Sequence, residues 1–158
     1  MNGETFTLFY NGVFSQWHPS PFEVDGVRYS CAEQYMMAQK ARTFGDGERL
    51  GKIMGSDDPG YQKAQGKLVR GYSDAVWHAV ARDVVARASV AKFASTPALL
   101  AALMATGGTT LVEASPTDRV WGIGLGEDDP GARDRSRWRG RNWLGQVLTE
   151  TRVRLGGR

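Results

Sequence analysis

The sequence predicts a predominantly helical α+β domain with a few short strands. Segments with helical spacing of apolar residues outnumber segments with strand-like alternation. The strand-like segments are not interleaved regularly with the helical ones, as a parallel α/β sheet would require. A length of 158 residues is that of one domain with a sizeable buried core, and neither an internal repeat nor a linker interrupts it. We therefore expect residues 1–158 to form a single domain.

The first elements expected are a strand, a hairpin and a helix. Residues 5–10 alternate and are rich in β-forming side chains, which predicts a strand. A loop with serine and proline breaks covers residues 14–22. Residues 24–29 contain Asp25-Gly26, a dipeptide that is typical of tight hairpin turns. The next segment predicts a helix from Ser30 to about Phe44.

Capping residues place the helices in the middle of the chain. Glycines at 45 and 47 end the preceding helix, and shorter helices are expected over residues 48–54 and 58–69. Ser73 begins the longest one, and Thr96-Pro97 begins another that ends at Gly107-Gly108. The longest helix has apolar residues at helical spacing, which predicts a buried stripe: Trp77, Val80, Ala81, Val84, Ala88 and Ala91.

The last third contains one strand, one long loop and one helix. Residues 109–114 are β-branched and alternating, so they predict a strand. Residues 122–141 are rich in glycine and charge and predict a loop. Asn142 is a helix-capping residue type, and we expect it to cap a final helix through Val153.

Several classes of protein do not fit the composition. No apolar run is long enough to span a bilayer, and a basic region followed by an apolar stretch is missing at the N-terminus, so we expect a cytoplasmic protein with no membrane partner. Cys31 is the single cysteine, which rules out an internal disulfide. His18 and His78 lie far apart, so we expect no metal site built from His and Cys and no cofactor. A carboxylate-bound magnesium ion is the alternative that stays open.

Positive charge is concentrated near the C-terminus. Residues 131–158 contain eight arginines and two acids, whereas the whole chain has a net charge of +3. Trp138 and Trp143 lie among these arginines, a pattern that fits phosphate or nucleic acid. The alternative is a solvated basic loop that pairs with the acidic residues 127–129.

The segment Ser30–Lys40 carries the clearest chemical pattern. Glu33 and Lys40 are seven residues apart, which places them within about 20° of one helix face. Met36 and Met37 lie between them, so both charged groups are expected to lose water contact, as acids, bases and reactive amines in active sites do. In the alternative interpretation, Ser30 and Glu33 form a capping box and Lys40 extends into water.

A second cluster follows the strand at residues 109–114. Asp118, Trp121 and Gly122 share one turn, where a glycine allows close approach of a ligand to the backbone and the indole can stack on a base. The structural alternatives are an acid that caps a turn and a tryptophan in the core. Lys92 can bind an anion or complement the end of its helix, and Trp77 fits the core better than a ligand platform.

Short motifs in a fixed order now suggest a family: Phe14-Ser15-Gln16, Tyr29-Ser30-Cys31-Ala32-Glu33-Gln34-Tyr35, Gln39-Lys40-Ala41, Trp77, Lys92-Phe93, Leu111-Val112-Glu113-Ala114-Ser115, Asp118-Arg119-Val120-Trp121-Gly122 and Asn142-Trp143-Leu144-Gly145. This ordered set resembles the YbiA/NADAR family of N-glycosidases over residues 9–152. The resemblance implies a YbiA-like fold.

The resemblance implies a hydrolase for sugars joined to a base through an amine. The expected substrates are phosphoribosylamino pyrimidine intermediates of riboflavin synthesis. One alternative is removal of ADP-ribose from guanine in nucleic acid, and another is a non-catalytic module that binds ADP-ribose. The expected partner is thus a small ribosylamino phosphate or an ADP-ribose-type ligand, with nucleic acid as the alternative and the oligomeric state left open.

The resemblance also implies roles for individual residues. The catalytic candidates are Glu33, Lys40 and Asp118. Glu33 is the first choice for the carboxylate beside the ribose C1 and Asp118 the second. Lys40 is either a nucleophile or a cation that holds the substrate. The implied substrate contacts are Ser15, Tyr35, Trp77, Lys92, Trp121, Gly122 and Asn142.

Overall fold

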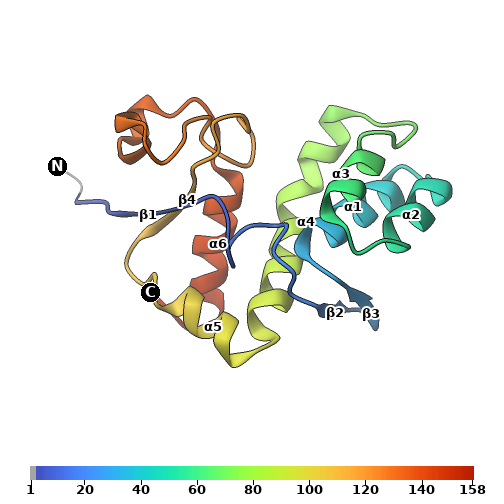
Figure 1. The fold of residues 1–158 in the computed structure, drawn as a ribbon, viewed down its shortest axis with the longest axis horizontal. Coiled ribbons are helices and arrows are strands. Elements are labelled where there is room, and N and C mark those ends of the chain that lie inside the picture. The colour runs from blue at the N-terminus through green and yellow to red at the C-terminus, as the bar shows by residue number, and fades with distance from the viewer. Residues whose placement is uncertain (1–2) are drawn as a thin grey trace. The chain divides into compact units, whose positions relative to one another are not determined.

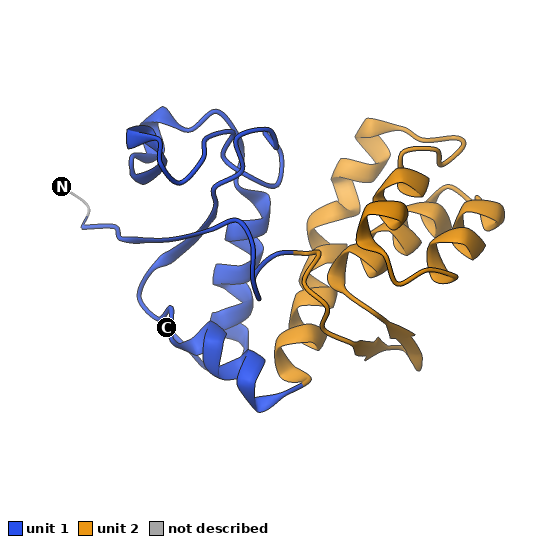
Figure 2. Cartoon of the chain, viewed as in Figure 1, with its two compact units in different colours: residues 1–15, 96–158 blue, residues 16–95 orange. Residues whose placement is uncertain are grey.

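The computed structural model describes residues 3–158 and confirms the α+β class, with helices dominating over a few short strands (Figure 1). The chain divides into two compact units (Figure 2). Unit 2 consists of Gln16–Ser95. Unit 1 combines the described residues up to Ser15 with Thr96–Arg158. Residues from both ends of the sequence therefore build unit 1.

Unit 2 begins with the expected hairpin. Strand β2 (Phe22–Val24) pairs antiparallel with β3 (Val27–Tyr29). Asp25 and Gly26 both have positive φ angles, of 53° and 78°. Two consecutive positive φ values define the tight turn for which an Asp-Gly pair is favoured. The local sequence alone therefore predicts this hairpin correctly.

Helix α1 (Ala32–Thr43) packs against the three other helices of unit 2: α2 (Gly47–Met54), α3 (Pro59–Gly66) and α4 (Asp74–Ala94). Helices α1 and α3 approach closely at Gly66, where an added Cβ would lie 2.0 Å from the Met37 sulfur. Helix α3 ends at Gly66, earlier than the expected residue 69. The prediction of three helices around residues 48–94 is otherwise confirmed.

The buried side of α4 differs from the predicted stripe. Trp77, Ala81 and Ala88 are buried, but Val80 is 37% exposed. The buried side is rotated toward Ser89 and Lys92, which the apolar pattern does not reveal because these residues are polar. Among the described helices, none is both long and apolar enough to cross a bilayer.

Unit 1 is built on a parallel strand pair. Strand β1 (Phe6–Phe9) pairs with β4 (Thr110–Glu113) in the register Phe6–Thr110 to Phe9–Glu113. Helix α6 (Trp143–Arg154) packs against β4, and α5 (Pro97–Met104) precedes that strand. The expected loop at residues 122–141 contains two short 3₁₀-helices, η1 (Pro130–Arg133) and η2 (Arg135–Arg137).

Asn142 precedes α6, but its side chain does not cap the helix. Its Oδ1 accepts a hydrogen bond from the Glu113 N–H at 3.0 Å, and its Nδ2 donates to the Leu111 carbonyl at 3.0 Å. The residue has a left-handed backbone, with φ of 54°. The expected side-chain cap is therefore wrong, because the amide is used to join the start of α6 to β4.

Gly145 allows α6 to approach β4 this closely. A Cβ at this position would lie 2.1 Å from the Leu111 carbonyl oxygen, a backbone atom that cannot rotate away. We expect Gly145→Ala to lower the free energy of unfolding by about 3 kcal/mol, as measured by urea denaturation. Gly51→Ala is the matched helical control, since a Cβ there meets open space and gains up to about 1 kcal/mol in helix propensity. Equal stability of both variants would contradict the close-packing argument.

Candidate functional site

Glu33 lies in the first turn of α1 with its carboxylate buried, and the residue is only 4% exposed. The Trp17 indole N–H donates to Glu33 Oε1 at 3.2 Å. The capping-box interpretation of Glu33 is wrong, because Cys31 is the N-cap and no side chain caps there. Gln34 instead accepts the Ser30 N–H at 2.7 Å. The Glu33 carboxylate is thus oriented by an indole and is not used to begin the helix.

Trp17 is a residue that the sequence reasoning missed. Its ring is anchored to Glu33 through the N–H, yet the residue is 44% exposed. The Lys63 amine lies 5.9 Å from the ring centroid. An exposed aromatic face fixed beside a buried carboxylate is suited to contact an apolar ligand surface. Its position directly after the Phe14-Ser15-Gln16 motif is the signal that could have found it.

Lys40 lies two turns after Glu33 on α1 and is half-buried. Burial lowers the pKa of its amine, and the Glu33 carboxylate opposes that change. The two charges therefore lie within electrostatic range of each other, as the helical spacing indicates. The Lys40 Nζ is also 4.5 Å from the centroid of the Tyr72 ring, a cation–π distance.

Lys92 is more deeply buried than Lys40, with 1% of the residue exposed. Burial lowers the pKa of its amine to about 7, against the opposing effect of the Cys31 thiol. The Lys92 charge also acts on His18. Burial and this charge together lower the pKa of the His18 imidazole. The lowered pKa increases the fraction of neutral Lys92 amine, which is the condition for a nucleophilic amine.

Tyr35 and Trp77 lie in the core of unit 2, at 1% and 5% exposure. The Tyr35 ring packs edge-on against Tyr29 at 4.9 Å, and its hydroxyl accepts from Gln39 Nε2 at 3.4 Å. Burial raises the pKa of the Tyr35 hydroxyl. Unit 2 thus contains five of the predicted site residues: Glu33, Lys40, Tyr35, Trp77 and Lys92.

The other predicted site residues belong to unit 1. Asp118 Oδ1 accepts the N–H groups of Val120 and Trp121 at 2.9 and 2.8 Å, so this acid caps a turn. Ser15 is half-buried, and its N–H donates to the Gly12 carbonyl at 3.0 Å.

Trp121, Gly122 and Asn142 connect this turn to α6. The Trp121 ring packs edge-on against Trp143, with centroids 5.6 Å apart. Gly122 is tightly enclosed, since a Cβ there would lie 3.0 Å from the Asp118 carbonyl oxygen. Its own carbonyl accepts the Asn142 N–H at 3.1 Å.

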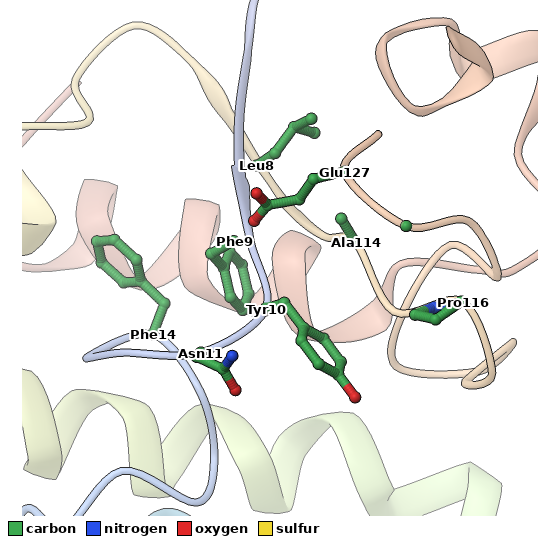
Figure 3. A pocket seen from close by; sticks show the side chains of 9 residues that line it. Leu8, Phe9, Tyr10, Asn11, Phe14, Ala114, Pro116 and Glu127 are labelled. Carbon is green, nitrogen blue, oxygen red and sulfur yellow. The ribbon is translucent and has the colours of Figure 1, made fainter. Parts of the chain in front are cut away.

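Unit 1 also contains a cavity of about 560 Å³ (Figure 3). It lies where the parallel strands β1 and β4 reach their carboxyl ends, the edge at which ligands bind in parallel sheets. None of the predicted site residues lines it. The lining residues are Leu8, Phe9, Tyr10, Asn11, Phe14, Ala114, Pro116, Gly126 and Glu127.

Metal ligands do not cluster in the described part of the chain. Across residues 3–158, no three His, Cys, Asp or Glu side chains gather closely enough to hold a metal ion. The ionisable groups of unit 2 that burial sets apart are the carboxylate of Glu33 and two amines with lowered pKa, Lys40 and Lys92.

Comparison with known proteins assigns the chain to a family. The NADAR domain family model matches residues 7–156, which include residues of both units. The chain belongs to the NADAR family. It is 39% identical over 145 residues to N-glycosidase R617 of Acanthamoeba polyphaga mimivirus, covering 89% of this chain and 85% of that protein. It is 36% identical over 170 residues to Protein irg-1 of Caenorhabditis elegans, covering 96% and 80%.

A bacterial relative links this NADAR chain to a solved structure. N-glycosidase YbiA of Escherichia coli (strain K12) is 30% identical over 157 residues, covering 96% of this chain and 89% of that protein. The NMR structure of the E. coli protein YbiA superimposes with a TM-score of 0.78, covering 96% of this chain and 85% of that one. The predicted family and YbiA-like fold are thus confirmed, and the names of these relatives agree with the predicted hydrolysis of N-glycosyl bonds.

Proposed function

We propose that this NADAR protein is an N-glycosidase that cleaves ribose from a base to which it is joined through an amine. The proposed substrates are phosphoribosylamino pyrimidine intermediates of riboflavin synthesis. One observation carries the proposal. In a chain that resembles proteins named N-glycosidases, a buried carboxylate, Glu33, is oriented by an exposed indole and lies in electrostatic range of a lysine with a lowered pKa.

The carboxylate fits the charge that this reaction develops. Cleavage of an N-glycosidic bond builds positive charge on the ribose C1 in an oxocarbenium-like transition state. In the proposed mechanism Glu33 stabilises this charge or activates water. Burial strengthens the interaction because fewer water molecules screen it. Asp118 is the second candidate for this role, although its Oδ1 already caps a turn.

An amine-linked ribose also allows a covalent route. Ring opening converts the C1–N linkage to an imine, and the neutral amine of Lys40 then adds to C1. A proton passes through Glu33 to the amino nitrogen of the base. The C1–N bond to the base breaks, and an imine to the lysine remains until water hydrolyses it. The lowered pKa of the Lys40 amine supports this route, because it increases the fraction of free amine.

Borohydride trapping tests the covalent route. Reduction during turnover is expected to attach the ribosyl phosphate to Lys40 irreversibly, with a mass increase on the peptide that contains this residue. Lys40→Met is expected to prevent the adduct and to lower turnover by at least about 100-fold. Lys52→Met, an exposed lysine on α2, is the matched control. An active Lys40→Met variant would exclude Lys40 as nucleophile, and an adduct on Lys92 would transfer that role to the more buried amine.

The remaining predicted residues keep binding roles in this proposal. Trp121 is the proposed stacking wall for the base, and Lys92 is the proposed cation for the phosphate. Ser15, Tyr35, Trp77, Gly122 and Asn142 shape the site. The deep burial of Tyr35, Trp77 and Lys92 supports a structural contribution to the site more strongly than direct contact with substrate.

A second candidate function is release of ADP-ribose from guanine in nucleic acid. The arginine-rich segment favours it, because arginines 133, 135, 137, 139 and 141 are all exposed. Arg135 pairs with Glu4 and lies 4.7 Å from the Trp138 ring centroid. The alternative interpretation paired this basic segment with the acidic residues 127–129. Arg135 instead pairs with Glu4, which is far away in sequence.

One assay separates these candidates. The purified protein is incubated with phosphoribosylamino pyrimidines and with DNA carrying ADP-ribosylated guanine, and base release is followed in each. Release from the pyrimidines alone supports the proposed function, and release from DNA alone supports the second candidate. A protein that binds ADP-ribose but releases base from neither substrate would be the non-catalytic module.

A further inference from the structure

Tyr72 lies over the amine of Lys40, in the connection between α3 and α4 (residues 67–73), and the proposed chemistry gives it no role. The Lys40 Nζ lies 4.5 Å from the centroid of its ring, within the range of a cation–π contact. The ring also packs against Phe44, one helical turn after Lys40, with centroids 5.4 Å apart. All three side chains belong to unit 2 (Figure 2). The ring therefore contacts both the amine and the end of the helix that carries it.

The connection that carries Tyr72 is held on both sides of this residue. Before it, the Arg70 N–H donates to Asp46 Oδ2 at 2.9 Å, and the Arg70 guanidinium donates to Asp46 Oδ1 at 3.0 Å. Asp46 is buried, and its own N–H donates to the Ala41 carbonyl of α1 at 2.9 Å. After it, the Ser73 side chain caps the first turn of α4. The backbone at Tyr72 therefore has a defined place relative to α1.

The hydroxyl of Tyr72 fixes the far end of its ring. It donates to Asp74 Oδ1 at 2.7 Å. Burial and this carboxylate raise the pKa of the Tyr72 hydroxyl to about 12. Burial lowers the pKa of the Lys40 amine below its ordinary 10.5, so the phenol stays neutral while this amine titrates. A neutral ring attracts an ammonium group through its negative face and attracts a neutral amine much less.

Charged groups of three elements also act on the Lys40 amine. The carboxylates of Glu33 on α1 and Asp74 on α4 raise the pKa that burial lowers, whereas the charge of Lys67, which follows α3, lowers it further. Because these effects partly cancel, one further attraction for the ammonium form changes the fraction of neutral amine. The Tyr72 ring supplies such an attraction at contact distance.

We propose that Tyr72 is a positioning residue for Lys40: its ring holds the amine at one place beside α1 and sets the pH at which the free amine forms. This inference rests on the proposed function, in which the neutral Lys40 amine adds to C1. The contact restricts a long, flexible side chain, so the amine begins each turnover from a defined place. The ring also favours the ammonium form, so its removal lets the free amine form at lower pH.

NMR of protein labelled with ¹³C at the lysine ε-carbons measures both effects without substrate. The chain has five lysines, and the Lys40 signal is the one that Lys40→Met removes. We expect the ring current of Tyr72 to move the ε-proton signal of Lys40 upfield. Tyr72→Leu is expected to abolish this displacement and to move the titration of the signal to lower pH by about half a unit or more. Tyr72→Phe keeps the ring and should retain both.

The matched control is Tyr61→Leu, because Tyr61 lies on α3 and has the same 39% exposure as Tyr72. It should leave the Lys40 signal and its titration unchanged. Steady-state kinetics then connect the contact to the reaction. Tyr72→Leu is expected to lower kcat by about 10-fold on its high-pH plateau, to change KM by less than about threefold, and to move the inflection of the kcat profile to lower pH with the NMR titration. A merely structural role would not move that inflection.

Four outcomes would overturn the proposal: a Lys40 signal without the upfield displacement in the wild type, the same titration in Tyr72→Leu and wild type, loss of both effects in Tyr72→Phe, or a plateau kcat of Tyr72→Leu within twofold of wild type. The two proposals fail separately. Turnover of ribosylamino substrate without the NMR effects removes the role of Tyr72 and leaves the N-glycosidase. The NMR effects without turnover of any ribosylamino substrate remove the N-glycosidase and leave the control of Lys40 by Tyr72.

Discussion

Glu33→Gln is expected to lower kcat for base release by about 1,000-fold while leaving substrate affinity within about threefold. The loss follows because glutamine can neither carry a proton nor place a negative charge beside the developing cation at C1. Glutamine keeps an oxygen that can accept the Trp17 indole N–H, so the local fold should survive. Steady-state kinetics of base release and a binding titration with the same substrate measure the two effects separately.

The control for this variant is Glu150→Gln, which makes the same change on an exposed position of α6. It should retain wild-type kcat, and both variants should unfold at denaturant concentrations close to that of wild type. A Glu33→Gln enzyme within 10-fold of wild-type kcat would show that another group provides the catalytic carboxylate. Asp118→Asn would then be the next variant to measure.

Lys92→Met is expected to change how stability depends on pH. The folded protein holds the amine at a pKa of about 7, against 10.5 for the ordinary side chain, because burial disfavours the charged form. Between these values the unfolded chain binds more protons than the folded one, so the wild-type free energy of unfolding rises with pH. The contribution is smallest below pH 7 and grows by at most about 5 kcal/mol as pH approaches 10.5. Methionine does not titrate, so the difference between the two proteins should follow this curve.

Urea denaturation of both proteins at intervals from pH 6 to pH 10 measures that difference. The readout is its slope with pH and not its absolute value, because methionine also removes the polar contacts of the amine. Lys52→Met, at an exposed position on α2, should leave the difference from wild type nearly constant across the range. A constant difference for Lys92→Met would mean that the folded protein keeps this amine charged at neutral pH.

Local sequence signals predicted most of the elements, and the reason is visible at particular residues. Ser73 and Thr96 accept backbone N–H groups of α4 and α5, as their residue types suggest. Asp25-Gly26 forms its turn with two positive φ angles. These signals act within a few residues along the chain and depend little on the rest of the fold. The prediction that Asn142 caps α6 is wrong, because its side-chain amide hydrogen-bonds two backbone groups of strand β4.

The candidate site was only partly accessible from the sequence. The spacing of Glu33 and Lys40 predicted their electrostatic interaction, which is a local property of one helix. The role of Trp17 was hidden, because its bond to Glu33 joins a loop to a helix across 16 positions. From the sequence, Lys92 is a charge at the end of a helix, and only its burial in the folded chain lowers its pKa to about 7.

By itself, the sequence determined the α+β class, the order of the elements, the family and the pair Glu33 and Lys40. Periodicity, caps and ordered motifs encode these features over short distances along the chain. Only the tertiary structure decided which groups lose water and which strand ends meet. Lys92 is buried, and the Glu33 carboxylate does not cap its helix. The ends of β1 and β4 meet at the cavity that Glu127 lines. Burial and long-range pairing depend on segments about 100 positions apart, as in the register of Phe9 with Glu113, and no local pattern contains that information.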